Sequence, residues 1–315
     1  MFGWAFLGCG NIARQVADEL SGTGTRIVSC WNRTPQRARE FAERYGCEAY
    51  PSPEQALSAP GVDGAYIAVT ADSHFAYMQK ALSCGTPVLC EKPFAVNVGE
   101  AERAFSLARS RGLYLAEAMW TWFNSPAQTV RRWIGEGKIG KVVRVAARYA
   151  ERYIDIPRFS SPALLGGALV DIGVYPIRYC YELFGMPRSV ACRGSLVGGV
   201  DHSEWVTLGY DGFSAELDIS VEESRGEEMT ITGTEGEIVI PAFHCAREAL
   251  LSGRESAHHT DDAPKYGVQM RRAAEEIAAG RRESAFSTPQ ATLDTMRLLD
   301  ECRRQLGLVY PCERK

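Results

Sequence analysis

Short apolar runs alternate with amphipathic stretches of helical length over the first 120 residues. The runs lie at 2–7, 26–31, 65–70, 86–90 and 114–118, and the helical stretches at 11–20, 35–45, 73–83 and 100–111. Strands that alternate with helices of this length form βαβ units, in which helices cover both faces of a parallel sheet. The pattern therefore predicts an α/β domain with a doubly wound parallel sheet over residues 1–119.

The pattern changes after about residue 120. Strand-like runs lie at 142–149, 189–196, 205–210, 214–221, 229–232 and 237–240, and helical segments at 127–135, 169–184, 268–279 and 289–306. The segments 210–213 and 233–236 contain Asp-Gly and Glu-Gly, which suit hairpin turns because glycine tolerates a positive φ. We expect a second domain over residues 120–315, of the α+β class, with a mainly antiparallel open sheet.

Composition excludes several classes of function. The 315 residues carry 35 Lys and Arg against 39 Asp and Glu, which gives a net charge of -4 and no basic excess for nucleic-acid binding. No run of about 18 apolar residues predicts a membrane span, and the first residues lack a signal-peptide pattern, so we expect a cytoplasmic protein. None of the ten cysteines forms a C-x-x-C pair, so we expect reduced thiols and no metal site.

Residues 8–13 read G-C-G-N-I-A, directly after the first strand and at the start of the first helix. Gly8 permits a sharp turn, Gly10 lets the backbone approach a pyrophosphate, and Ala13 keeps the helix close to its strand. The N–H groups of the helix start, at Asn11 and Ile12, then face the anion. This pattern predicts dinucleotide binding in a Rossmann domain, and the alternative is an ordinary glycine turn.

The end of the second strand bears on the choice of nucleotide. An NAD enzyme usually has an acidic side chain at this place, whereas this chain has Asn32, Arg33 and, one turn later, Arg37. A guanidinium binds a 2'-phosphate through paired charge-assisted hydrogen bonds, whereas a carboxylate repels it. We expect NADP(H) to be preferred and NAD(H) to be possible, unless the two arginines are simply exposed residues at a helix start.

Charged residues interrupt an apolar strand end at Glu91 and Lys92, where a doubly wound sheet binds its ligands. Both side chains are costly to bury, so we expect them to face a site, with a structural salt bridge as the alternative. His74 opens the helix after the third strand, and it either shapes the nicotinamide pocket or caps that helix.

A carboxylate and a phenol stand out in the apolar segment 166–176. If this segment is helical, Asp171 and Tyr175 are four residues apart and lie on one face. Pro176 removes a helix N–H and is expected to bend the chain. The simpler alternative is a core tyrosine bonded to an aspartate that caps a helix.

These segments resemble the Gfo/Idh/MocA oxidoreductases. The resemblance covers the turn 8–13, the segment 70–74 that begins at Thr70, the Glu-Lys-Pro at 91–93, the segment 166–176 and the segment 233–238, in the order typical of the family. The Asp-Ile-Gly-Val-Tyr-Pro form is similar to the branch that contains dimeric dihydrodiol dehydrogenases and NADP-dependent xylose dehydrogenases. The resemblance implies that Thr70, His74, Glu91 and Lys92 line the cofactor site.

The resemblance also implies that Lys92 and Tyr175 form the catalytic pair and that Asp171 holds a substrate hydroxyl. A free phenol has a pKa near 10, and a neighbouring ammonium favours its ionised form. Tyr175 would then exchange the alcohol proton as hydride moves between the carbon and nicotinamide. The Lys-Pro peptide is typically cis in the family, and the proton and hydride groups would come from different domains.

Aromatic residues offer surfaces for the substrate, which we expect to be a sugar, a cyclic polyol or a diol. We expect Trp120, Trp122 and Phe159 to contribute, although core packing is the alternative for each. Trp122 stands where the branch has an arginine in its W-x-R-F stretch, which weakens transfer of the dihydrodiol substrate. The family resemblance assigns substrate binding and oligomer contacts to the second domain, and implies a homo-oligomer, either a dimer or a tetramer.

Other interpretations remain at this stage. The segment 258–262 carries two histidines and two aspartates, the residue types of a metal site, but its polar surroundings suit a solvated loop better. An NAD-dependent glycoside hydrolase of the same superfamily and a non-catalytic nucleotide sensor are the alternative functions.

Overall fold

The chain divides into two compact units in a computed structural model that describes residues 1–263 and 265–314. The first unit contains Met1–Phe123 and Ala263–Leu293, and the second contains Asn124–Asp262 and Asp294–Lys315. The sequence predicted one boundary after residue 119, so the return of residues 263–293 to the first unit was not expected. The roles expected of the two domains stay predictions.

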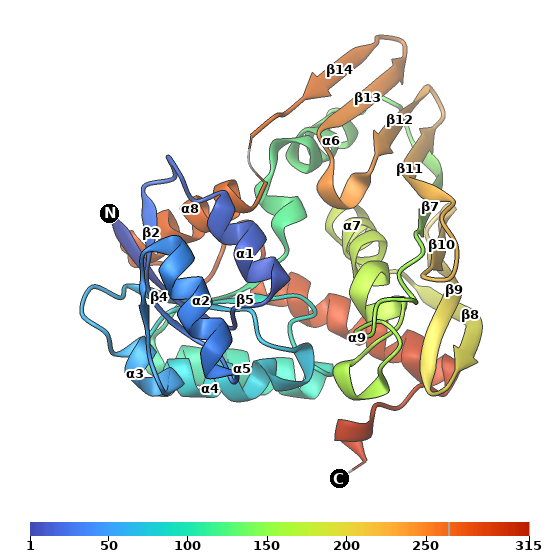
Figure 1. Cartoon of the computed structure of the whole chain (residues 1–315). Coiled ribbons are helices and arrows are strands. Elements are labelled where there is room, and N and C mark those ends of the chain that lie inside the picture. Colours follow the sequence, from blue (N-terminus) through green and yellow to red (C-terminus); the bar gives the residue numbers. More distant parts are fainter. Residues whose placement is uncertain (264, 315) are drawn as a thin grey trace. The chain divides into compact units, whose positions relative to one another are not determined.

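A six-stranded parallel sheet forms the first unit (Figure 1). Its strands are β1 (Phe2–Leu7), β2 (Thr25–Trp31), β3 (Glu48–Ala49), β4 (Gly64–Ile67), β5 (Val88–Glu91) and β6 (Leu115–Ala118). Its helical elements are α1 (Asn11–Asp18), α2 (Pro35–Tyr45), α3 (Pro53–Leu57), η1 (Ala71–Ser73), α4 (His74–Ser83), α5 (Val98–Arg111), η2 (Trp120–Phe123) and α8 (Lys265–Ala278). The doubly wound α/β fold predicted from the sequence is confirmed.

Strand order places the ligand crevice of this sheet. The order β3-β2-β1-β4-β5-β6 runs outward from β1 in both directions, so the switch point lies between β1 and β4. Below it, Trp4, Phe6, Phe41 and Tyr66 are fully buried in one apolar core. The turns that follow β1, β2, β4 and β5 lie at the carboxyl ends of parallel strands, where this fold binds ligands.

Helix α8 belongs to the first unit although it follows the second sheet in the chain. Glu19, at the end of α1, accepts hydrogen bonds at Oε2 from the backbone N–H groups of Tyr266 (2.7 Å) and Gly267 (3.1 Å). A carboxylate near the N-terminus of α8 also interacts favourably with the dipole of that helix. The ring of Tyr266 stacks on Trp120 with centroids 4.5 Å apart. These contacts fix the start of α8.

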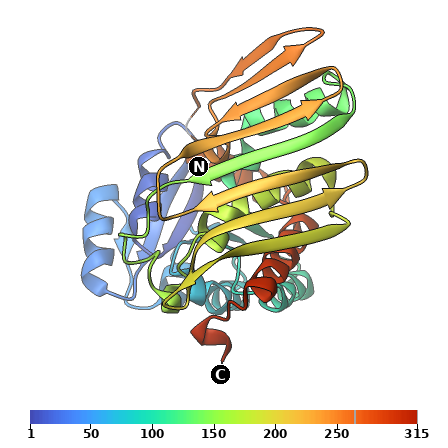
Figure 2. The same cartoon turned by 90° about the vertical axis from the view of Figure 1, so that its right-hand side faces the viewer.

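An eight-stranded sheet forms the second unit (Figure 2). Its strands are β7 (Val142–Ala150), β8 (Ser189–Val197), β9 (Val200–Tyr210), β10 (Phe213–Ser220), β11 (Gly226–Gly233), β12 (Gly236–Pro241), β13 (Glu248–Gly253) and β14 (Ala257–Thr260). Its helical elements are α6 (Ser125–Gly135), η3 (Pro162–Leu164), η4 (Leu169–Gly173), α7 (Val174–Phe184), η5 (Phe243–Cys245) and η6 (Pro311–Glu313), and α9 (Pro289–Leu306) enters this unit at Asp294.

The second sheet is mainly antiparallel, as expected. Only the β7–β10 pair is parallel among the pairings of the described strands. Helix α7 packs on β7 and β10, and Figure 2 shows α6 and α7 behind the sheet. Two-residue turns join β9 to β10 and β11 to β12 at the predicted places, and Gly212 has a φ of 84°.

Three strands were missed, namely β3, β13 and β14. The expectation of a solvated loop at 258–262 was therefore wrong in part, because His258 and His259 lie in the edge strand β14. His258 Nε2 lies 2.8 Å from Glu248 Oε2 on β13, and His259 Nε2 lies 2.8 Å from Ser125 Oγ. The two histidines are neighbours in a polar strand, so they point to opposite faces of it and have different partners.

None of the ten cysteines, all within the described residues, forms a disulfide. The expectation of reduced thiols is consistent with this. Over the residues that the structure describes, no helix combines the length and the apolar character needed to cross a bilayer.

Candidate functional site

The turn after β1 requires glycine at its first position. Gly8 has a φ of 103°, and its N–H donates to the Trp31 carbonyl at 2.8 Å. A Cβ at this position would lie 2.3 Å from the carbonyl oxygen of Ala68, far inside any contact that atoms tolerate. A Cβ at Gly10, in contrast, would meet no described atom within 4 Å. The second glycine therefore leaves open space above the turn.

The start of helix α1 has the features of an anion site. Gly10 is the N-cap, no side chain caps the helix, and the first turn, which begins at Asn11 and Ile12, contains no acidic residue. Ala13 is fully buried and lets the helix lie against the core. Backbone N–H groups at such a terminus bind phosphate, so the turn fits a dinucleotide pyrophosphate.

The end of β2 presents one structural side chain and two exposed cations. Asn32 Oδ1 accepts a hydrogen bond from the backbone N–H of Cys9 at 3.2 Å, and its Nδ2 donates to the Thr34 carbonyl at 3.1 Å. Asn32 thus ties the phosphate-binding turn to the start of α2. Arg33 and Arg37 are exposed, and neither forms an ion pair with a described residue. Their charges can therefore bind an added phosphate.

His74 connects two loops at the carboxyl edge of the parallel sheet. Its Nδ1 lies 2.8 Å from the Pro93 carbonyl oxygen and its Nε2 lies 3.2 Å from that of Val69. Burial lowers the pKa of this histidine, while the two carbonyl contacts oppose that effect. Thr70 begins η1 between these two loops with a half-buried side chain. His74 therefore holds the loop that contains Lys92 and Pro93.

Glu91 is a buried carboxyl beside a half-buried lysine. Its Oε1 accepts a hydrogen bond from the Tyr66 hydroxyl at 2.7 Å, and its Oε2 accepts from the backbone N–H of Lys92 at 3.3 Å. Burial raises the pKa of Glu91 to about 7, with a smaller contribution from the buried Glu117. The Lys92–Pro93 peptide is cis, as the family resemblance implied. Glu91 thus fixes the backbone that carries Lys92.

Asp171 and Tyr175 lie at the start of the central helix of the second unit. Residues Leu169–Gly173 form a π-helical turn, η4, which continues directly into α7. Asp171 is 4% exposed and Tyr175 is 6% exposed, so the predicted buried carboxylate and phenol are present on one continuous helical segment. Pro176 lies in the first turn of α7, where its missing N–H costs little, and the wider turn before it absorbs the change in geometry.

Two glycines allow this helical segment to approach the sheet. A Cβ at Gly166 would lie 2.6 Å from the Phe159 carbonyl oxygen, and one at Gly167, whose φ is 123°, would lie 2.0 Å from Asp201 Oδ1. The buried Asp201, on β9, accepts a hydrogen bond at Oδ2 from the Leu169 N–H at 2.6 Å. Asp201 therefore anchors the start of η4, a role that no local sequence pattern indicated.

Asp171 is held by a cation. Arg158 Nη1 lies 2.6 Å from Asp171 Oδ2, and the Arg158 guanidinium also lies over the Phe159 ring, 4.3 Å from its centroid. Phe159 is 5% exposed and stacks on Tyr153 at 5.0 Å. The structure thus places Phe159 beside Asp171 through Arg158, a residue that the sequence did not single out.

A histidine and a second tyrosine adjoin Tyr175. The ring centroid of His244 lies 5.2 Å from that of Tyr175 and 4.8 Å from that of Tyr149, and the two tyrosine rings are 6.2 Å apart. His244 Nε2 lies 3.3 Å from the Tyr149 hydroxyl. Burial raises the pKa of Tyr149 strongly, so this phenol is protonated. None of these neighbours was found by sequence reasoning, because nothing local marks His244.

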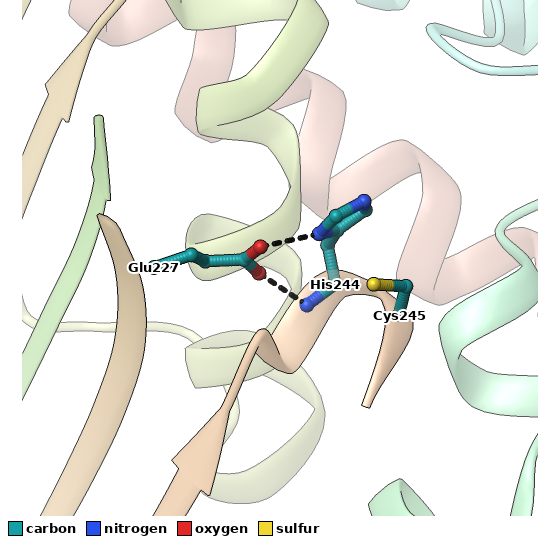
Figure 3. Close-up of side chains that lie close together, drawn as sticks. All are labelled: Glu227, His244 and Cys245. Carbon is teal, nitrogen blue, oxygen red and sulfur yellow. Dashed lines mark hydrogen bonds and ion pairs between the residues drawn. The ribbon is translucent and has the colours of Figure 1, made fainter. Parts of the chain in front are cut away.

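Glu227, His244 and Cys245 have the residue types of a metal site (Figure 3). However, Glu227 Oε2 lies only 2.6 Å from His244 Nδ1, and Glu227 Oε1 accepts from the His244 backbone N–H at 2.6 Å. Ligand bonds of about 2.0–2.2 Å to one zinc ion would hold those oxygen and nitrogen atoms about 3 Å or more apart. A shared proton, rather than an ion, explains the contact.

The predicted aromatic residues of η2 are buried in the first unit. Trp122 is fully buried, and Trp120 is 7% exposed and stacked on Tyr266. The geometry therefore favours core packing for Trp122, while substrate contact by Trp120 and Trp122 stays a prediction.

Comparisons with family models and with whole proteins both match this chain to oxidoreductases. Residues 2–118 match the Oxidoreductase family, NAD-binding Rossmann fold, and residues 127–239 match the GFO/IDH/MocA C-terminal domain. The scyllo-inositol 2-dehydrogenase (NADP(+)) of Bacillus subtilis (strain 168) is 32% identical over a gapped alignment of 302 positions, which covers 91% of this chain and 92% of that protein. The trans-1,2-dihydrobenzene-1,2-diol dehydrogenase of Homo sapiens is 29% identical over a gapped alignment of 331 positions, which covers 99% of each protein.

Solved structures show the same fold. A 3-ketoreductase from Actinomadura kijaniata, in an open conformation with TDP-benzene and NADP, has a TM-score of 0.83 and 25% identity, and the match covers 97% of this chain and 98% of that one. An aldose-aldose oxidoreductase from Caulobacter crescentus has a TM-score of 0.88 and 21% identity, and the match covers 96% and 97% of the two chains.

Proposed function

The chain belongs to the Gfo/Idh/MocA family of oxidoreductases, and from this we propose that it is an NADP-dependent dehydrogenase that interconverts an alcohol and a carbonyl on a sugar or other cyclic polyol or diol. The observation that carries the proposal is Tyr175, a buried phenol at the start of α7 that shares its helical segment with the buried carboxylate of Asp171. A phenol and a carboxylate are the groups needed to exchange a proton with one substrate hydroxyl and to bind another.

Two observations support the preference for NADP(H) over NAD(H). Arg33 and Arg37 follow β2 as exposed cations, and the segment from Trp31 to Arg37 carries no carboxylate for the ribose hydroxyls. The inositol dehydrogenase relative is named for NADP(+), and the ketoreductase was solved with NADP. Gly8, Gly10, Asn11, Ile12 and Ala13 would hold the pyrophosphate, with Thr70, His74, Glu91 and Lys92 at the neighbouring strand ends.

Proton transfer is the step assigned to this chain's own residues. Bound NADP(H) supplies or accepts the hydride. Tyr175 Oη gives a proton to the substrate oxygen in reduction and removes it in oxidation. Asp171, paired with Arg158, accepts a hydrogen bond from a neighbouring substrate hydroxyl. We assign Lys92 to the stabilisation of the Tyr175 phenolate, on the strength of the family resemblance and of the known effect of an ammonium on a phenol.

The test measures cofactor binding first and then the effect of removing the Tyr175 hydroxyl. Fluorescence titration with NADPH and NADH, followed by a panel of inositols, aldoses and cyclic diols at saturating cofactor, should show tighter NADPH binding and turnover of at least one polyol. Tyr175→Phe removes only the phenol proton and should lower kcat by about 10^2- to 10^4-fold while NADPH binds as before. Tyr210→Phe is the matched control, because that hydroxyl makes only a 3.4 Å contact at a hairpin. Full activity of Tyr175→Phe would refute the assignment.

Neither alternative function is supported by the relatives, which are named dehydrogenases and reductases. Release of sugar without net change in reduced nicotinamide would favour a glycoside hydrolase. Tight cofactor binding without turnover across the panel would favour a sensor.

We also propose a homo-oligomer that uses the face of the second sheet opposite α7. Large apolar side chains are exposed on strands of this sheet, among them Trp205 (38%) and Leu250 (37%). Light scattering coupled to size exclusion should report a dimer or tetramer, and a monomer at micromolar concentration would refute the proposal.

A further inference from the structure

A half-buried ion pair lies next to the proposed catalytic tyrosine. Glu227, on β11, is 8% exposed at its side chain, and His244, on η5, is 21% exposed. The carboxylate contacts the histidine twice, at the backbone N–H and at Nδ1, so the imidazole is held in one orientation (Figure 3). This bidentate contact fixes Nδ1 as a proton donor and leaves Nε2 directed at the Tyr149 hydroxyl, 3.3 Å away.

The groups that face His244 favour its charged form. Burial alone lowers the pKa of His244, but hydrogen bonds to Cys245 and Glu227 and the charge of Glu227 raise it to about 9. The phenols of Tyr149 on β7 and Tyr175 on α7 also adjoin the imidazole ring. Glu227 is thus the carboxylate that pairs with this imidazole, and the ring carries a proton throughout the neutral range.

We propose that His244, oriented by its two contacts with Glu227, is a positioning residue that holds the Tyr175 ring against Tyr149 and stabilises the Tyr175 phenolate. The inference rests on the proposed function of Tyr175 as the acid and base. An imidazolium whose ring lies 5.2 Å from the phenol ring favours the ionised phenol. The second unit would then contain its own cation for the proton-transfer step, in addition to the role assigned to Lys92.

The arrangement also accounts for Tyr149. Its ring stacks on His244 at 4.8 Å with an interplanar angle of 28°, and it meets Phe243 edge to face at 6.0 Å. Tyr149 therefore supports one side of the imidazole while Glu227 holds the other. If the Glu227 carboxylate were removed, His244 would become neutral but its ring would keep its packing. Such a change separates the electrostatic role of His244 from a structural role.

The primary measurement is the ionisation of Tyr175 in the full-length protein. Ultraviolet absorbance of tyrosinate is followed against pH with and without Tyr175→Phe, so that the difference isolates this phenol. His244→Gln should move the midpoint of Tyr175 up by about one pH unit, at the low end of the usual effect of a nearby opposite charge because Glu227 offsets part of it. With a turned-over polyol, the acidic limb of kcat/KM should move upward to match, while NADPH binding is unchanged.

Another Glu–His pair in the same unit supplies the matched control. His258 Nε2 lies 2.8 Å from Glu248 Oε2, but this pair is exposed on β13 and the edge strand β14. His258→Gln should leave the Tyr175 midpoint and the pH profile as in the wild type. An equal shift in both histidine variants would show a general charge effect and overturn the proposal.

Glu227→Gln keeps the inference testable if His244→Gln does not fold. Nuclear magnetic resonance should then show the His244 midpoint falling from about 9 toward the ordinary value of 6.5, with the Tyr175 midpoint rising. A lower melting temperature with an unchanged Tyr175 midpoint would show a purely structural role and overturn the proposal. Stoichiometric zinc retained after dialysis by the wild type, but not by His244→Gln, would overturn it in favour of a metal site.

These results separate the two proposals. If Tyr175→Phe is fully active, the proposed function fails whatever the titrations show. If Tyr175→Phe is inactive and the Tyr175 midpoint does not move in His244→Gln, only the role of His244 fails.

Discussion

Gly10→Ala should abolish tight cofactor binding without unfolding the protein. The backbone at Gly10 has φ and ψ of -80° and -168°, which alanine adopts freely, and the added Cβ meets no described atom within 4 Å. The lost N-cap preference and the lower entropy of the unfolded chain are each below about 1 kcal/mol and opposite in sign. The methyl group would instead fill the space above the α1 N-terminus, where we propose the pyrophosphate binds.

The magnitude follows from the hydrogen bonds that such a methyl group would displace. Two charge-assisted bonds from backbone N–H groups to a phosphate contribute about 3 kcal/mol together, which corresponds to an increase in Kd of about 100-fold. Gly8→Ala, two residues earlier, is the contrasting variant. Its Cβ would lie 2.3 Å from the Ala68 carbonyl oxygen at a φ of 103°, so it should destabilise the fold by about 2–5 kcal/mol.

Fluorescence titration with NADPH and thermal denaturation without cofactor distinguish these effects. Gly10→Ala should melt within about 2 °C of the wild type, and Gly8→Ala should melt about 5–15 °C lower, given the usual relation between free energy and melting temperature. Wild-type NADPH affinity in a folded Gly10→Ala variant would refute the assignment of the turn. A wild-type melting temperature for Gly8→Ala would refute the steric reasoning.

Three further outcomes can be checked. Arg33→Ala should weaken NADPH binding about 10- to 100-fold and leave NADH binding unchanged, while Arg39→Ala, an exposed control on α2, should change neither in the same titrations. Glu91 has a pKa raised to about 7, so the folded state holds the carboxyl proton more tightly than the unfolded chain does. The contribution of this proton to the free energy of unfolding is present in full below about pH 4.5 and is lost as the pH rises through 7. Glu91→Gln should therefore gain stability relative to the wild type, by about 3 kcal/mol between pH 5 and pH 8 in urea unfolding, and a constant difference would contradict this. Glu19→Ala removes the acceptor for two N–H groups of α8 and should cost about 1–2 kcal/mol in urea unfolding and speed hydrogen exchange at the start of α8, whereas unchanged exchange would contradict the capping role.

Local periodicity predicts the elements whose partners are close in the chain. The parallel strands of the first unit and the hairpin at Gly212 follow from apolar runs and turn residues that lie side by side. The strand β14 was missed because Ala257–Thr260 contains two histidines and a threonine, and an edge strand needs no apolar face to pair. Its pairing with β13 supplies the order that its composition does not indicate.

The return of α8 to the first unit could not be derived from the sequence of that helix. An amphipathic helix shows that it has a partner but not which partner, and the contacts that decide it join Glu19 to Tyr266 and Gly267 across more than 240 positions. A cut after residue 119 was the simplest division of the chain. It assigned 263–293 to the second domain because that segment follows the second sheet.

The same limit applies to the segment 166–176, which contains the proposed catalytic residues, and Asp201 shows why. The double glycine at 166–167 indicates that some group approaches the backbone closely. That group is the carboxylate of Asp201 on β9, which lies 32 positions from Leu169, whose N–H donates a hydrogen bond to it. Because Asp201 Oδ1 would lie 2.0 Å from any Cβ at Gly167, the position of this carboxylate requires glycine at residue 167. A buried carboxylate without Leu169 N–H as donor would be strongly unfavourable, and η4 without that acceptor would lose its anchor. The position of Asp171 and Tyr175 therefore depends on a distant strand, and a motif read along the chain indicates the groups that we propose to react but not the residues that hold them.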